Sequence, residues 1–134
     1  MTTRRTDILD GFKTHLDQLD SIERVYKQYR YIDEVNDFPA ITFIGRRETR
    51  DHRGDGKKLA TLGIALRLYI YDRDIAELDL RMRQVEDQID TFAAAQRALG
   101  VELVQVVTVE TDEGLMRPYQ IGDMNILITY EVDV

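Results

Sequence analysis

The sequence LATLGIALRLYIY, at residues 59–71, decides the fold. Apolar residues occupy every second position, which is the spacing of a β-strand that buries one face. At about 3.3 Å per residue the strand spans about 43 Å, which is long for a globular protein. The face that we expect to be buried consists of Ala60, Leu62, Ile64, Leu66, Leu68 and Ile70. With a preceding apolar strand at 40–47, this stretch predicts a long β-hairpin whose end projects from the domain.

A helix is predicted on each side of this hairpin. Residues 6–19 place their apolar side chains on one helical face. Residues 74–99 carry a single apolar stripe with spacings of three and four residues. Gly100 is a natural helix stop, and we expect a bend or break near Thr91.

Further strands are predicted at 22–31, 101–110 and 122–132. The element order is α-β-β-β-α-β-β. It predicts an α+β fold, in which a mostly antiparallel β-sheet with a long β-hairpin packs against an N-terminal helix and one long central helix. The chain length of 134 residues fits a single domain at 1–134. The strand at 101–110 is apolar on both faces, which predicts an interior position in the sheet or a contact between subunits.

The composition excludes several classes of function. The chain has no cysteine, so disulfides and thiolate metal sites are ruled out, and a reducing compartment fits. A net charge of −7 disfavours tight binding to nucleic acids. The sequence shows no targeting segment and no membrane-spanning run. We therefore expect a soluble cytoplasmic protein that does not contact a membrane.

Candidate catalytic residues are few. His15 occupies a boundary position of the first helix and His52 lies in a loop, with no nucleophile pattern near either. No glycine-rich phosphate loop precedes a helix. Asp112 and Glu113 form an acidic turn that could bind a divalent cation or simply lead into the next strand. We expect no enzyme activity, no bound metal and no cofactor.

The segment at 46–58, between the hairpin strands, has a distinctive charge. Its six basic and three acidic residues give a net charge of +3. Because the whole chain has a net charge of −7, the residues outside this segment have a net charge of −10. Such polarity suits contact with identical copies or with an acidic partner, although a solvated loop has the same composition. Residues 49–58 are polar and contain two glycines, which predicts a flexible hairpin loop. The candidate interface residues are Arg46, Arg47, Arg50, His52, Arg53, Lys57, Lys58, Asp112 and Glu113.

Several local sequences accompany this order of elements. They are FPAITFI at 38–44 before the charged loop, LRLYIY at 66–71 before the long helix, TDEG at 111–114 and ILITYEV at 126–132. In this combination the chain resembles the tail terminator proteins of long-tailed bacteriophages, which are related to minor tail and tail-completion proteins. The resemblance covers nearly the whole chain.

The resemblance implies a virion structural protein in the phage tail or neck, assembled in the host cytoplasm. Members form a homohexameric ring that caps the tail tube, stops its polymerisation and offers a docking surface to the head connector. The implied partners are other copies, the tail tube protein and the head–tail connector or neck protein. DNA would pass through the ring without specific binding, since an acidic lining repels phosphates. Two alternatives stay open: another phage neck or head–tail adaptor protein, and a small-ligand-binding α+β domain.

Overall fold

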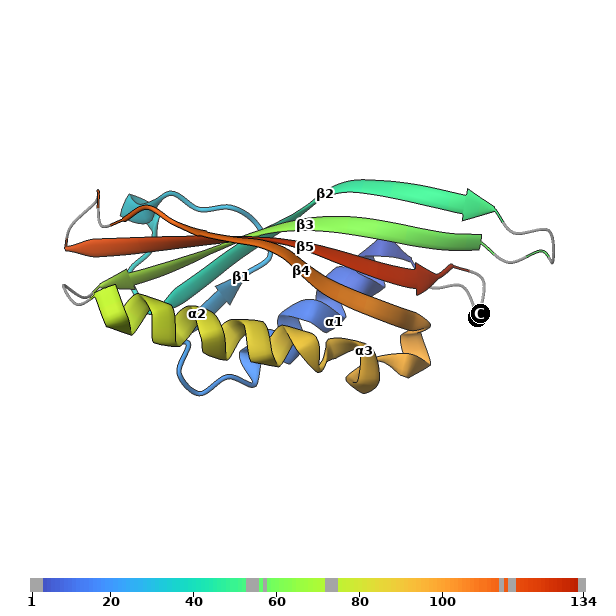
Figure 1. The fold of residues 1–134 in the computed structure, drawn as a ribbon, viewed down its shortest axis with the longest axis horizontal. Helices are drawn as coiled ribbons and strands as arrows, with labels where there is room; N and C mark the ends of the chain where they lie inside the picture. The colour runs from blue at the N-terminus through green and yellow to red at the C-terminus, as the bar shows by residue number, and fades with distance from the viewer. Residues whose placement is uncertain are drawn as a thin grey trace.

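A computed structural model describes residues 4–52, 56, 58–71, 75–113, 115 and 118–132. One five-stranded sheet, in the order β1-β2-β3-β5-β4, forms a layer with the helices beside it (Figure 1). The predicted α+β fold and its mostly antiparallel sheet are confirmed. The elements are α1 (Arg5–Asp17), β1 (Arg24–Tyr26), the 3-10 turn η1 (Ile32–Glu34), β2 (Ala40–His52), β3 (Lys58–Tyr71), α2 (Ile75–Asp90), α3 (Phe92–Ala95), the 3-10 turn η2 (Arg97–Leu99), β4 (Val101–Thr111) and β5 (Tyr119–Glu131).

The β2–β3 hairpin is longer than the sequence predicted. β2 continues to His52, which pairs with Lys58, so residues 49–52 of the predicted flexible loop are strand. A period-2 pattern could not reveal this extension, because the added residues are polar on both faces. The hairpin end extends beyond the helices (Figure 1). Arg53 and Lys57 lie outside the described residues, and the flexibility of 49–58 stays a prediction.

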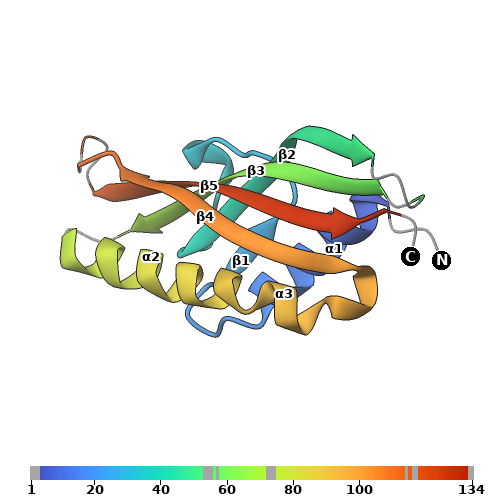
Figure 2. The same cartoon turned by 45° about the vertical axis from the view of Figure 1, so that its right-hand side comes forward.

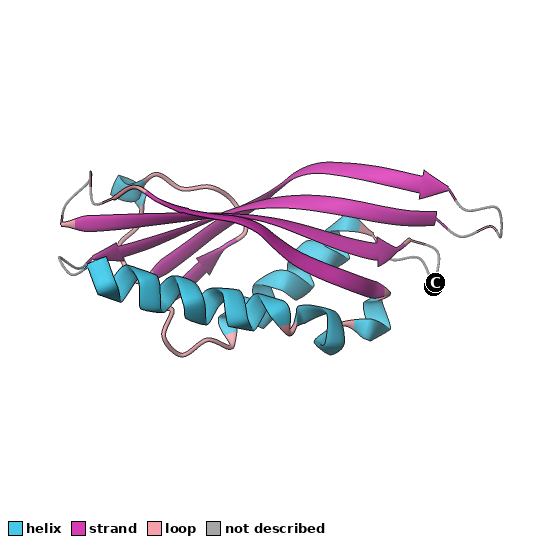
Figure 3. Cartoon of the chain, viewed as in Figure 1, coloured by secondary structure: helices cyan, strands magenta, loops and turns pink. Residues whose placement is uncertain are grey.

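The α-helices α1, α2 and α3 lie on one side of the sheet (Figure 3). We call this side the inner face. The face of β3 that was predicted to be buried is at most 3% exposed at every position and belongs to the main core. The helix residues Leu78, Met82, Val85 and Ile89 belong to the same core, which confirms the predicted packing of strand and helix.

Helices α1 and α2 pack side by side under the sheet (Figure 2). Phe12 of α1 meets Phe43 of β2 and Phe92 of α3 edge-on, with ring centroids 5.1 and 5.4 Å apart. The predicted break near Thr91 is confirmed, since α2 ends at Asp90. The predicted helix start at Asp74 lies outside the described residues. None of the described helices is long and apolar enough to cross a membrane.

The strand predicted at 22–31 is mostly wrong, because only Arg24–Tyr26 pairs with β2. The residues that follow form a loop over the outer face of the sheet, the face turned away from the helices. There Val35 and Tyr69 are buried in a second small core, and the Tyr69 hydroxyl donates to the Arg30 carbonyl at 2.8 Å. The apolar and tyrosine residues of this stretch thus pack on the sheet from outside instead of joining it.

The interior position offered for 101–110 is also wrong. β4 pairs with β5 alone and forms an edge of the sheet. Gly100 has a φ of 80°, a left-handed conformation that ends the helical segment and starts this edge strand. Leu103 and Val107 remain 47% and 56% exposed. The alternative prediction for 101–110, that this strand contacts another subunit, stays a prediction.

Candidate assembly surfaces

A groove of about 380 Å³ lies on the outer face. Its floor includes Gly63 of β3, which has no side chain, and Leu127 of β5 and Val107 of β4 stand beside it. The strand register shifts next to the groove in both β2 and β4, which makes Arg46 and Val107 the extra residues of two β-bulges. Bulges re-aim side chains, and here they line a depression in the middle of the sheet.

Apolar side chains around this groove are left uncovered. The outer-face residues Leu103 and Val107 on β4, Leu127 on β5 and Ile44 on β2 are between 36% and 56% exposed. Figure 1 shows no helix over this part of the sheet. A contiguous exposed apolar patch is typical of a protein–protein contact.

Some basic residues of the hairpin lie beside the groove and others lie nearer the hairpin end. Arg46 and Arg47 are exposed on the rim of the groove, and neither forms an ion pair with another described residue. Arg50, by contrast, pairs with the Glu48 carboxylate at 2.7 Å, so its charge is already matched within the subunit. His52 is exposed and Lys58 half-buried at the hairpin end. The unmatched positive charge of the described hairpin is therefore concentrated beside the groove.

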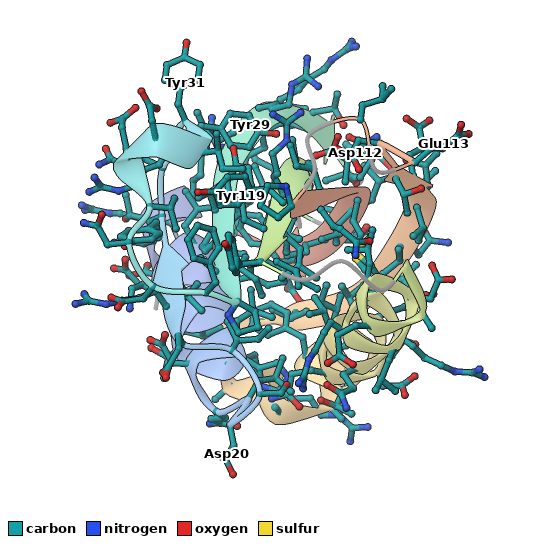
Figure 4. The ribbon with its side chains drawn as sticks, turned by 90° about the vertical axis from the view of Figure 1, so that its left-hand side faces the viewer. Asp20, Tyr29, Tyr31, Asp112, Glu113 and Tyr119 are labelled. Carbon is teal, nitrogen blue, oxygen red and sulfur yellow. The ribbon has the colours of Figure 1, made fainter. Side chains whose placement is uncertain are left out.

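Six of the seven tyrosines gather at the opposite end of the sheet from the hairpin. Figure 4 looks onto this end, where Tyr31 points outward and Tyr119 lies near the centre. Tyr31, Tyr71 and Tyr29 are 78%, 60% and 48% exposed. Tyr119 contacts Tyr71 and Phe38, with ring centroids 5.2 and 5.5 Å apart, which holds the rings in place.

At the tyrosine end, burial and charged neighbours both act on Tyr29. Burial raises the pKa of Tyr29, and the positive charges of Arg67 and Arg46 oppose that rise. Arg67 itself forms two hydrogen bonds with Asp123, at 2.7 and 3.2 Å, and this pairing raises the pKa of Arg67.

Asp112 and Glu113 lie far from the basic hairpin, in the turn after β4 (Figure 4). Asp112 donates its N–H to the Ile121 carbonyl at 3.0 Å, and its Oδ1 accepts the Ile121 N–H at 3.3 Å. Glu113 has a φ of 57°, the left-handed conformation of a tight turn. No group of three metal-ligating side chains occurs among the described residues. These hydrogen bonds favour a structural role for Asp112 in the turn over cation binding. Asp112 is half-buried, whereas Glu113 is exposed.

His15 is buried, at 4% exposure, and is not a boundary residue as expected. Its Nε2 lies 2.7 Å from the Gln88 carbonyl and 2.9 Å from the Thr91 hydroxyl, and Gln88 Nε2 donates to the His15 carbonyl at 2.8 Å. This histidine therefore joins α1 to the end of α2. Its place between apolar positions was the available signal for burial.

A second exposed surface runs along α2. Leu80 is 50% exposed in the middle of it. We call this surface the α2 ridge; its exposed members are Asp79, Leu80, Arg83, Asp87 and Asp90. Three carboxylates against one guanidinium make the ridge acidic, and it lies on the helix side of the molecule (Figure 1).

Comparisons with known proteins agree with this architecture. A family model described as "Bacteriophage Tail Tube Terminator Protein" matches residues 2–134. A solved chain from the "Virion of native gene transfer agent (GTA) particle" is similar in structure, with a TM-score of 0.65 and 10% sequence identity over 92% of this chain and 93% of that chain. At this identity the likeness shows a shared fold. None of the curated proteins matches the chain.

Proposed function

Because the chain belongs to the bacteriophage tail tube terminator family, we propose that it forms a ring that caps the tail tube. The ring stops tube polymerisation and presents a docking surface to the head connector. The observation that carries this proposal is the family match over residues 2–134, nearly the entire chain. We expect a hexamer, with other copies, the tail tube protein and the connector or neck protein as its partners.

The surfaces of the subunit support a ring. A ring needs heterologous contacts, in which one patch meets a different patch of the next copy. The outer face carries exposed apolar residues and two arginines that have no ion-pair partner among the described residues, whereas the chain outside residues 46–58 has a net charge of −10. An acidic body would also let DNA pass, because like charges repel. The protein would act in the virion after assembly in the host cytoplasm.

The chemistry of the chain favours a structural role over catalysis. His15 is used in packing, and His52 is exposed on a projecting hairpin away from any rigid pocket. The cavity on the outer face is open and apolar, with arginines on one rim, and lacks a nucleophile. We propose that the protein needs no cofactor or metal for its function.

The decisive experiment is a phage that lacks this protein. Tails of uncontrolled length that fail to join heads, with normal tails restored by a plasmid copy, would support termination. Normal tails joined to heads would rule the proposal out. Tails of normal length that fail only in joining would instead favour a neck-adaptor role. Electron microscopy of the particles measures tail length and joining together.

A further inference from the structure

The outer face has the composition of a contact surface. We call it the groove surface; it consists of Ile44, Arg46, Arg47, Val107 and Leu127. Arginine is enriched among the residues that dominate binding energy, and apolar side chains supply the buried centre of an interface. Its two rim arginines have no ion-pair partner among the described residues. The groove surface is therefore apolar and cationic, and it fits an acidic partner with an apolar projection.

The α2 ridge has the complementary composition. Leu80 projects from it at 50% exposure, and Asp79 and Asp87 flank it along the exposed side of the helix. On an α-helix, residues three, four and seven apart share a face, so Leu80 and Asp87 lie one above the other. The ridge thus offers one apolar side chain between carboxylates.

Both surfaces belong to every copy but lie on opposite sides of the sheet (Figures 1 and 3). A subunit cannot bring its own α2 ridge to its own groove surface. We propose that the α2 ridge of a second copy docks on the groove surface, with Leu80 in the space above Gly63 and the ridge carboxylates facing Arg46 and Arg47. This contact rests on the ring proposed above and names the two patches that build it.

The geometry favours a second copy as the occupant. The contact is heterologous, and a heterologous contact repeated between copies builds a closed ring when the rotation between neighbours closes. The charge asymmetry has the required sign, since residues 46–58 carry +3 and the rest of the chain −10. The depression of about 380 Å³ is open, so it admits a ridge of side chains from a helix and not only a single small group.

A cysteine cross-link tests the contact in assembled tails. The natural chain has no cysteine, so every disulfide between two copies must join introduced residues. The double variant Leu80→Cys with Val107→Cys is expected to yield, on mild oxidation of purified tails, a ladder of covalently linked copies. The control Glu23→Cys with Val107→Cys keeps the groove cysteine and moves the other to an exposed residue next to β1, outside α2. It is expected to yield no ladder.

Three results would overturn the contact. One is the absence of a ladder in tails that contain the Leu80→Cys, Val107→Cys protein and have normal length. Another is a link from the cysteine at position 107 to a different tail protein, which would make another component the occupant. The third is an equal ladder from the Glu23→Cys control. Tails of normal length show that termination is intact, so failure of this contact is distinguishable from failure of the proposed function.

A charge exchange provides an independent measurement. Arg47→Glu is expected to reduce the yield of capped tails about tenfold or more, because like charges then face each other across the contact. Asp87→Lys alone is expected to do the same, whereas the two changes together should restore the yield. Arg97→Glu, at another exposed arginine, is the matched control and should leave the yield unchanged. A double variant as defective as either single variant would contradict the pairing.

Discussion

The buried hydroxyl of Tyr130 on β5 donates a hydrogen bond to the Glu48 carboxylate on β2, across the intervening strand β3. Tyr130 is fully buried, and the Glu48 side chain is only 10% exposed. Arg50 supplies the second partner of the carboxylate. The interaction links β2, at the base of the projecting hairpin, to β5. We therefore expect loss of the Tyr130 hydroxyl to lower the stability of the subunit.

Tyr130→Phe is therefore expected to lower the free energy of unfolding by about 1.5–3 kcal/mol, the range for a hydrogen bond to a charged group. The change leaves a nearly buried carboxylate without one of its donors. Urea unfolding of the purified protein measures the effect. Tyr31→Phe, at an exposed ring, is the control and should change stability by less than about 0.5 kcal/mol.

The stability of the protein should also fall at high pH. Burial and the hydrogen bond to Glu48 raise the pKa of Tyr130 above its usual value of about 10. The native state therefore keeps a proton that the unfolded chain releases, so this contribution is intact below pH about 10 and is lost progressively above it. Urea unfolding at pH 8 to 11 should show a decline that Tyr130→Phe reduces. Burial raises the pKa of Tyr29 as well, so part of the decline should remain. An unchanged slope in Tyr130→Phe would contradict this assignment.

Leucines on the two faces of the sheet should respond differently to truncation. Leu66 of β3 is fully buried on the inner face, so Leu66→Ala should cost about 2–5 kcal/mol through lost burial and a cavity. Leu127 lies on the outer face and is 36% exposed. Leu127→Ala should leave the isolated subunit nearly as stable while reducing assembly. Thermal unfolding and the yield of capped tails measure the two effects separately.

Gly122 and Met82 are expected to be energetically coupled. A Cβ at Gly122 of β5 would collide with the thioether of Met82 on α2, which is only 4% exposed and has little space to move. Gly122→Ala should cost about 1–3 kcal/mol through overpacking. In the double variant with Met82→Ala the collision is absent, so the combined loss should be smaller than the sum of the single losses. Strict additivity would show that the two sites do not touch.

Assembly should protect the end of the hairpin from hydrogen exchange. Residues 49–52 pair with β3 but extend beyond the helices, so their backbone hydrogen bonds have little packing around them. We expect residues 49–58 to exchange quickly in the free subunit and more slowly in the assembled tail. Hydrogen exchange measured by mass spectrometry compares the two states, with α1 as an internal reference. Equal and strong protection in both would show that the hairpin is rigid on its own.

The candidate site was only partly predictable. The charge of 46–58 marked the hairpin as unusual, and the apolar faces of 101–110 suggested a subunit contact. Sequence could not show that Arg50 is matched by Glu48 or that Arg46 and Arg47 border a groove. Those facts depend on the β-bulges and on Gly63 lying between β2 and β5, which is a matter of strand register. Asp112 was grouped with the interface residues, whereas its backbone and side chain close a turn.

Local periodicity by itself determined the α+β class, the long hairpin, the break at Thr91 and the buried face of β3. Each of these follows from which side chains of one segment face the same way, which a single stretch of sequence contains. Only the tertiary structure decided that β4 is an edge, that residues 27–39 cover the outer face at one end and that the middle of that face is bare. Strand order and coverage are set by contacts between segments far apart in the chain, and apolar spacing specifies the face that is buried but not the partner that buries it.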